Sequence, residues 1–229
     1  MRPEDYYKDI PARSSDWVGR ASEPGFAPMK VAIDAARPHL RTGGRVLDIG
    51  CQGGHQLDLL SGEFDELVGL DITPYGDMWD QFPHARFVVH DVDGAPLPFE
   101  DGFFRTVICT NVLEHVFDVF GLVREIDRVL EDGGTCFVSV PNVSAWRHIL
   151  ALFRGRVPRT GAQEYPFTDR QGWDGQHLHY FTHTELRWLL ESAGLTLTAT
   201  NVYGRLPALK RLAPRFLSGS VDLVAQKRI

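Results

Sequence analysis

The sequence predicts an α/β protein built on a doubly wound, mostly parallel β-sheet with helices on both faces. Short apolar segments suited to buried strands alternate with segments whose apolar residues recur at helical spacing. Glycine and carboxylate residues follow several of these apolar segments directly, as they do at the ligand-binding edge of a doubly wound sheet. The 229 residues, 43% hydrophobic and 24% charged, suffice for one large core.

The elements of the N-terminal half follow from local patterns. Residues 29–40 place Ala, Val and Ile on one helical face, and residues 54–61 continue a glycine-rich turn as a helix. Residues 77–82 are expected to form a short helix. Apolar runs rich in β-branched residues predict strands over residues 45–49, 66–71, 85–90 and 104–110. Right-handed crossovers would make these strands parallel.

The C-terminal half continues the alternation and ends in a different pairing. Residues 118–130 have apolar positions at helical spacing, and residues 134–140 form a further strand. In THTELRWLLESAG, Thr182 can cap a helix, Glu185 completes a capping box and Gly194 ends the helix. Residues 195–202 and 219–227 read as a final antiparallel pair of strands.

Composition excludes several classes of protein. A net charge of −6 argues against nonspecific nucleic-acid binding, which needs a broad basic surface. No apolar run approaches the roughly 18 residues that span a bilayer, and no secretory signal precedes the first elements. Cys51, Cys109 and Cys136 lie in or beside apolar segments and are not closely spaced. We therefore expect reduced, buried thiols in a cytoplasmic protein.

Acidic residues follow three successive predicted strands. Asp48 stands in a glycine-rich turn with Gly50, Gly53 and Gly54, where glycine lets the backbone approach a ligand closely. Asp71 follows the second strand, where a carboxylate can accept the hydroxyls of a ribose. Asp91 follows the third strand, and beside the apolar Val92 it could receive an exocyclic amine of adenine. The pattern predicts a nucleoside site.

The charge of the turn narrows the class of ligand that it could bind. A turn that binds pyrophosphate is neutral and directs a helix N-terminus at the phosphates, whereas Asp48 places a carboxylate in this turn. A carboxylate suits a ligand that carries positive charge. S-adenosylmethionine, a phosphate-free nucleoside with a sulfonium and an ammonium group, meets that requirement.

The motifs together resemble the Rossmann-like, class I S-adenosylmethionine-dependent methyltransferases over residues 29–202. The segments that carry the resemblance are VLDIGCQGG, LVGLD, VVHDVDGAPLPFEDGFF, TNVLEHV and LVREIDRVLEDGGTCFVSVPN. The resemblance implies seven strands with the last one antiparallel, and within the family it is closest to methyltransferases that act on small molecules and sugars. The cofactor-binding residues that we expect are Asp48, Gly50, Gln52, Gly54, Asp71, Ile72, Asp91, Val92 and Asn111.

Gln52 departs from the family pattern D-x-G-x-G-x-G, where the second glycine would stand. Glutamine favours negative φ, and its Cβ adds bulk beside the methionine portion of the cofactor. We expect cofactor binding to be retained, with Gly53 supplying the conformational freedom. The alternative is a domain that keeps the fold without binding the cofactor.

Two histidines are candidate catalytic bases. His115, in VLEHV, follows the fourth strand on the expected acceptor side, although in the family this Glu-His pair often has a structural role. His177 precedes the helix that would cap the cleft. His179, at the start of HYFT, is expected to be structural or to orient the substrate. A metal site of His177, His179 and His183 fits by spacing but lacks nearby carboxylates, so we expect no metal.

Two segments distinguish the chain from the bare fold, which we expect to form one domain over residues 1–229. Residues 1–28, with Tyr6 and Tyr7, could fold over the cofactor as an arm or lid, or form a disordered tail. Residues 142–176 are expected to form an acceptor lid. Its first part places Trp146, Ile149, Leu150 and Phe153 on an apolar stripe beside Arg147, Arg154, Arg156 and Arg159. This part could pack on the core, recognise an anion or lie on a membrane surface.

These observations predict an S-adenosylmethionine-dependent methyltransferase that methylates an oxygen of a small molecule. A sugar, a nucleotide sugar or a secondary metabolite would serve as acceptor, with an anionic acceptor as one option. The alternative is a methyltransferase-fold binding module that regulates a partner enzyme without transferring methyl groups. The sequence predicts neither a nucleic-acid partner nor a transmembrane segment, and it leaves the oligomeric state open.

Overall fold

The computed structural model describes residues 27–93, 95–160, 177–202 and 207–229. The predicted arm up to residue 26, with Tyr6 and Tyr7, and residues 161–176 of the predicted lid lie outside the described residues. The boundaries proposed for the domain, the arm and the lid therefore stay predictions.

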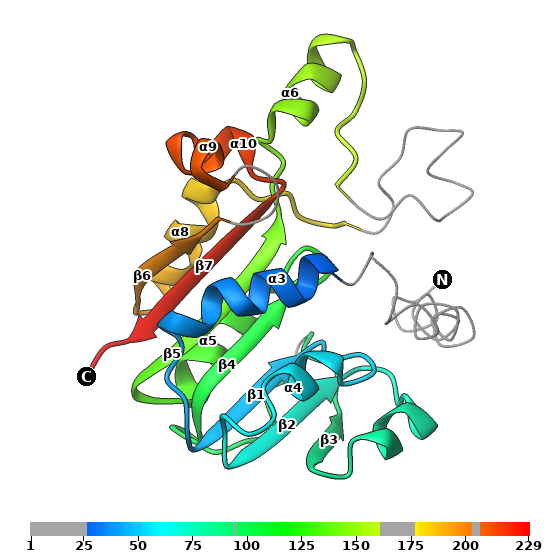
Figure 1. Cartoon of the computed structure of the whole chain (residues 1–229), viewed down its shortest axis with the longest axis vertical. Coiled ribbons are helices and arrows are strands. Elements are labelled where there is room, and N and C mark those ends of the chain that lie inside the picture. The colour runs from blue at the N-terminus through cyan, green and yellow to red at the C-terminus, as the bar shows by residue number, and fades with distance from the viewer. Residues whose placement is uncertain (1–26, 94, 161–176, 203–206) are drawn as a thin grey trace.

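A seven-stranded sheet with the order β3-β2-β1-β4-β5-β7-β6 forms the centre of the molecule (Figure 1). Its strands are β1 (Arg45–Ile49), β2 (Glu66–Asp71), β3 (Ala85–Val89), β4 (Phe104–Thr110), β5 (Leu130–Pro141), β6 (Leu195–Asn201) and β7 (Ser220–Lys227). The pairs from β3 to β5 are parallel, whereas β7 runs antiparallel to both β5 and β6. The predicted fold class is therefore confirmed.

Helices cover both faces of this sheet. They are α3 (Ala27–Ala36), α4 (His55–Leu59), α5 (Val119–Val129), α6 (Trp146–Phe153), α8 (His183–Ser192), α9 (Pro207–Leu212) and α10 (Pro214–Leu217), with the 3₁₀ turns η2 (Arg37–His39) and η3 (Gly76–Gln81). On one face, α3 and α4 bury Ile33 and Leu57 against Val46 and Ile108. On the other, α5 and α8 bury their apolar residues against Leu47 and Val138. Because strand side chains alternate between faces, each strand supplies both clusters.

The predicted strands coincide with the observed ones to within a residue, except at β5. This strand begins at Leu130, directly after α5, because the chain turns from helix into sheet without an intervening loop. The helix expected over residues 29–40 ends at Ala36 and continues as η2, which contains Pro38. The predicted helix at residues 77–82 is the 3₁₀ turn η3. The capping box of Thr182 and Glu185 is confirmed.

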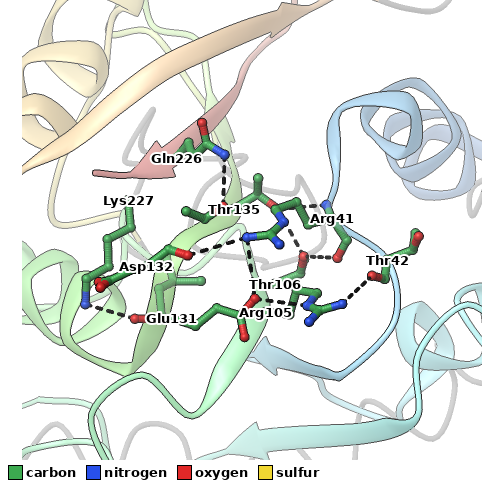
Figure 2. A network of polar contacts seen from close by, with 11 residues as sticks. Arg41, Thr42, Arg105, Thr106, Glu131, Asp132, Thr135, Gln226 and Lys227 are labelled. Carbon is green, nitrogen blue, oxygen red and sulfur yellow. Dashed lines mark hydrogen bonds and ion pairs between the residues drawn. The ribbon is translucent and has the colours of Figure 1, made fainter. Parts of the chain in front are cut away.

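A polar network joins the amino ends of the strands, at the edge opposite the predicted site (Figure 2). Glu131 lies 3.0 Å from Nε of Arg105 and 3.5 Å from Nη1 of Arg41. The Thr106 hydroxyl donates to the Arg41 carbonyl at 2.8 Å and contacts the Thr135 hydroxyl at 3.0 Å. Acidic and basic groups are thus paired at this end of the molecule.

In the part of the chain that the structure describes, no helix combines the length and apolarity needed to span a membrane. The expected cytoplasmic location stays a prediction. The three cysteines are buried free thiols, as expected.

Candidate functional site

The site lies where the connections of the sheet diverge. From β1 the chain leads outward to β2 and β3, whereas β4 and β5 lie on the other side of β1. In open α/β sheets, ligands bind at the carboxyl ends of the strands at this switch point. The loops that follow β1 and β4 therefore form the centre of the candidate site, with the loops after β2 and β3 beside them.

The loop after β1 turns sharply at Gly50. Gly50 has φ of 74°, and a Cβ there would overlap Cγ2 of Val112, which belongs to the loop after β4. The Leu70 carbonyl accepts the amides of Gly50 at 2.8 Å and Cys51 at 3.1 Å, which ties the loop to the end of β2. Glycine is required at position 50 because both its φ and its space exclude a side chain.

The backbone at Gln52 contradicts the expectation that Gly53 supplies the conformational freedom of this loop. It takes φ of 45°, and positive φ also falls on Gly54, with 87°, but not on Gly53. Gln52 thus itself adopts a left-handed conformation that favours glycine, and Gly53 does not compensate for it. Hydrogen bonds hold its peptide groups: the amide donates to Asp71 Oδ2 at 2.9 Å, and Trp79 Nε1 donates to its carbonyl at 2.6 Å.

An aromatic support beneath this loop was missed by sequence reasoning. The Trp79 ring of η3 stacks on Phe87 of β3 with centroids 4.7 Å apart and an interplanar angle of 6°. A Cβ on Gly53 would overlap Met78 Cε, and one on Gly54 would approach Phe87 Cζ to 2.8 Å. The sequence signal was the aromatic content of residues 75–87, which secondary-structure patterns do not weigh.

A buried side-chain pair also ties the loop helix to β4. Gln56 Nε2 donates to the Thr110 hydroxyl at 2.8 Å, and both residues are buried. Gln56 lies in α4 directly after the glycine-rich loop, and Thr110 is the last residue of β4. This hydrogen bond fixes the relative position of the two strand ends that form the centre of the site.

Asp48 and Asp71 concentrate negative charge at the site. Asp48 is fully buried, and neither of its carboxylate oxygens has a hydrogen-bond partner within the described residues. Burial, with the nearby Asp71 carboxylate, raises the pKa of Asp48 well above its ordinary value. Burial also raises the pKa of Asp71, against the lowering effect of the Thr73 and Gln52 amides that it accepts. An uncompensated buried carboxylate favours a cationic ligand.

The remaining predicted cofactor residues lie at the same edge of the sheet. Ile72, directly after β2, is exposed, and Val92 is half-buried beyond β3. Asp91 is exposed and accepts the Asp93 amide at 2.9 Å. Asn111, directly after β4, is exposed and has φ of 53°, with its amide bonded to the Ser139 carbonyl at 2.8 Å. The strand ends therefore bring all the predicted cofactor residues to one edge.

The two candidate bases lie next to each other. His115 and His177 meet edge to face, with ring centroids 4.8 Å apart. The Leu178 and His179 amides bond to the Glu114 carbonyl at 2.7 and 3.2 Å, which attaches the segment of His177 to the loop after β4. The Thr160 hydroxyl lies 2.6 Å from Nδ1 of His177. Residues far apart in the sequence thus form one polar cluster at the loop after β4.

The histidines considered for a metal site are not brought together. His183 contacts the Thr200 hydroxyl at 3.1 Å, and the His179 ring lies 6.3 Å from that of Phe181. Potential ligand atoms of Glu114, His115 and His177 lie within 4.8 Å of one another instead. Among the described residues this is the cluster that could hold a metal ion. Its carboxylate comes from the loop after β4, outside the segment that the sequence argument considered.

The residues at this edge fit S-adenosylmethionine. Asp71 holds two backbone amides, but each carboxylate oxygen can accept more than one hydrogen bond, so it can still receive ribose hydroxyls. The fully buried Asp48 would offer a carboxylate to the cationic methionine portion of such a ligand. The exposed Ile72 and the half-buried Val92 provide apolar surface for a base.

Comparisons with known proteins agree with this geometry. A family profile described as "Methyltransferase domain" matches residues 24–200. A "Probable S-adenosylmethionine-dependent methyltransferase" of Mycolicibacterium smegmatis is 34% identical over 165 residues, covering 71% of this chain and 56% of the relative. A "Ubiquinone biosynthesis O-methyltransferase" of Paracidovorax citrulli is 30% identical over 134 residues, covering 54% of this chain and 56% of the relative. The chain thus spans about half the length of these curated relatives.

Solved structures share the fold at low identity. A methyltransferase in complex with the Haloferax volcanii Trm112 activator has a TM-score of 0.67 and 17% identity, covering 100% of this chain and 98% of that chain. The 1,6-didemethyltoxoflavin-N1-methyltransferase of Burkholderia thailandensis, with bound S-adenosylhomocysteine, has a TM-score of 0.60 and 17% identity, covering 100% and 92%. The profile match and the relative that is 34% identical place the chain in the methyltransferase-domain family, with S-adenosylmethionine as its cofactor, and the solved structures share its fold.

Proposed function

We propose that this protein transfers the methyl group of S-adenosylmethionine to a hydroxyl oxygen of a small-molecule acceptor. The observation that carries the proposal is the contact between His115 and His177 beside the carboxyl end of β4. An imidazole at the acceptor side of a cofactor site can take the proton of a hydroxyl group. The names of relatives add support for oxygen as the acceptor atom, because one of them is a ubiquinone biosynthesis O-methyltransferase.

The reaction needs little covalent chemistry from the protein. The acceptor oxygen forms a bond to the methyl carbon in line with the breaking sulfur–carbon bond, and the sulfonium becomes a neutral thioether. The hydroxyl proton passes to the imidazole of His177 or His115. Positioning by the loops after β1 and β4 supplies part of the rate, and the base contributes typically about 10²–10⁴-fold.

His177 is the stronger candidate for the base. Its Nδ1 lies 2.6 Å from the Thr160 hydroxyl, so this contact orients the ring and leaves Nε2 to accept a proton. His115 lies on the loop that follows β4 and packs edge-on against the His177 ring. We assign His177 to proton abstraction and His115 to orienting its ring or to sharing the proton.

A screen of acceptors with methyl-labelled S-adenosylmethionine tests the proposal. Acceptors should include phenolic and sugar hydroxyl compounds, nucleotide sugars and matched amines. His177→Ala should lower kcat on the order of 10²-fold with the Kd of S-adenosylmethionine nearly unchanged, and the loss should be smaller for acceptors of low pKa. His39→Ala, an exposed histidine in η2 away from the site, is the control and should retain the full activity.

Other outcomes of the screen would overturn the proposal at different points. Transfer to amines alone would contradict the assignment of oxygen. Unchanged turnover in His177→Ala and His115→Ala would remove both residues from proton transfer. Cofactor binding without transfer to any acceptor would favour the alternative, a binding module that regulates a partner enzyme.

A further inference from the structure

The loop after β4 and the segment before α8 bring one carboxylate and two imidazoles together. Glu114, His115 and His177 each offer one ligand atom, and these three atoms lie within 4.8 Å of one another. Ligand atoms bound about 2.1 Å from a metal ion lie roughly 3–4 Å apart, so small side-chain movements would close this cluster on an ion. Imidazole nitrogen and carboxylate oxygen are ligands of first-row divalent transition ions. The cluster therefore has the donor atoms of a metal site and nearly its spacing.

Main-chain hydrogen bonds hold the two parts of this cluster together. The Leu178 and His179 amides donate to the Glu114 carbonyl at 2.7 and 3.2 Å. The His115 amide donates to the Val112 carbonyl at 2.9 Å. The loop after β4 thus carries two of the three ligands and fixes the segment that carries the third. Such preorganisation lowers the cost of ordering the ligands when an ion binds.

Burial and one further contact suit the ligands to this role. Glu114 is only 1% exposed, and a bound cation stabilises a buried carboxylate. The Thr160 hydroxyl contacts Nδ1 of His177 at 2.6 Å, which leaves Nε2 available to an ion. Metal-bound imidazoles in proteins usually engage their second nitrogen in such a contact, which fixes the ring. Three protein ligands leave a tetrahedral ion one open position, as in catalytic zinc sites.

The cluster lies close to the cofactor site. Glu114 follows Asn111 by three residues in the loop after β4. Burial, with the carboxylates of Glu114 and Asp48 nearby, raises the pKa of the Cys109 thiol in β4. Both carboxylates therefore lie near the carboxyl end of β4, where the proposed function requires the acceptor. An ion held by the cluster would be within reach of the acceptor hydroxyl.

We propose that Glu114, His115 and His177 bind one divalent transition ion of the Zn²⁺ type, and that the acceptor hydroxyl occupies its open position. The second statement rests on the proposed function. A bound ion lowers the pKa of the hydroxyl, which gives its proton to water. The oxygen then bonds to the methyl carbon, while the sulfur–carbon bond breaks and leaves its electron pair on sulfur. Without the ion His177 takes the proton, so this residue is needed in both states.

Calorimetry of the full chain with Zn²⁺ or Co²⁺ alone, without a histidine tag and after treatment with a chelator, tests the site. The wild-type protein should bind one ion per chain. His177→Ala and Glu114→Gln should each lower its affinity about 100-fold or more, and Thr160→Val about 10-fold, because this hydroxyl orients a ligand. His39→Ala and His183→Ala, which change histidines outside the cluster, should leave the affinity unchanged. Retained binding of S-adenosylhomocysteine shows that each variant is folded.

Two further readouts follow the bound ion. Co²⁺ in the cluster should give the visible absorption of a four- or five-coordinate ion, and His177→Ala should lose this absorption. Loading the wild-type protein with Zn²⁺ should raise kcat about 10-fold or more for hydroxyl acceptors of high pKa, and a chelator should reverse the increase. In Glu114→Gln the increase should disappear.

The opposite outcomes separate the two parts of the proposal. Absence of binding, or binding that the changes at His177 and Glu114 leave intact, would overturn the metal site. Binding without a rise in kcat would overturn the part of the ion in methyl transfer. Ion binding in a protein that methylates no acceptor would uphold the metal site and count against the proposed function, so the two failures are distinguishable.

Discussion

At the scale of single residues, we expect Asp48 to favour binding of the cofactor at the expense of stability. Its carboxylate is fully buried without a hydrogen-bond partner among the described residues, and its pKa is raised by burial and by Asp71. A buried charge without a partner costs free energy of folding. The same charge becomes favourable when a cationic ligand approaches it. Stability and affinity should therefore respond in opposite directions to its removal.

Asp48→Asn should stabilise the cofactor-free protein at neutral pH by about 1–3 kcal/mol and weaken cofactor binding. The pKa of Asp48 is higher in the folded state than in the unfolded state. At a pH between these two pKa values, the folded protein therefore binds more protons than the unfolded protein does. The wild-type protein therefore loses stability as pH rises through that window. The free energy of unfolding of the wild-type protein should therefore approach that of Asp48→Asn as the pH falls from neutral toward the ordinary carboxyl range, about pH 4.

Urea denaturation across this pH range measures the effect, and calorimetry with S-adenosylmethionine measures the affinity. Asp77→Asn, at an exposed position in η3, is the control and should change neither quantity appreciably. A less stable Asp48→Asn protein with full affinity would contradict the role given to this carboxylate.

Gln52 takes a backbone conformation that favours glycine at the position where the family pattern has a glycine. It has φ of 45°, which costs a non-glycine residue about 1–2 kcal/mol. Its amide and carbonyl make the hydrogen bonds to Asp71 and Trp79, so these contacts do not depend on the side chain. The substitution therefore affects stability more than the shape of the loop.

A series at position 52 should separate these effects. Gln52→Gly and Gln52→Asn should match or exceed the wild-type stability, because both residues tolerate positive φ. Gln52→Val should be less stable by about 1–2 kcal/mol, because a β-branched residue is strained there. Urea denaturation gives the order, and calorimetry should give similar cofactor affinities for the Gly, Asn and Gln proteins. Equal stability of the Val and Gly variants would show that the position is not strained.

At the scale of elements, local patterns predicted most strands and the capping box of α8. β4 was predicted at its observed bounds because four of its seven residues are β-branched and Arg105 is its one charged residue. The α8 capping box was also predictable, since Thr182 and Glu185 act within one helical turn. α9 and α10 were not predicted: both are short, begin at a proline and have no long apolar period. Short helices depend on tertiary contacts more than on their own sequence.

The parts of the site that were missed depend on contacts between elements. Trp79 supports the loop after β1 from η3, and Gln56 bonds to Thr110 across the sheet edge. His115 and His177 were each proposed from their own motif, but their contact depends on how the segment before α8 returns to the loop after β4. Spacing within a single segment could not supply these pairs. For the same reason the cluster with Glu114 lay outside the sequence argument.

At the scale of the whole molecule, the sheet gives its two edges different functions. At the amino ends of the strands, Thr106, Thr135 and the ion pairs of Glu131 connect β4 and β5 with the segment before β1 (Figure 2). At the carboxyl ends, buried carboxylates and residues with positive φ are held in arrangements that cost free energy. A cofactor that contacts the loops after several strands would compensate these costs together. Its binding should therefore stabilise the whole sheet.

Saturating cofactor should raise the midpoint of thermal unfolding, and Asp71 should be required for this. At a concentration about 100 times Kd, the ligand adds about 2.7 kcal/mol, which corresponds to roughly 5–10 °C for a chain of this size. Asp71→Ala should weaken affinity by about 1.5–3 kcal/mol and so remove most of the shift at the same concentration. Differential scanning calorimetry with S-adenosylhomocysteine measures it. Asp77→Ala changes an exposed acidic residue in η3 and is the matched control, so it should keep the full shift. An undiminished shift in Asp71→Ala would show that the ribose does not bind at Asp71.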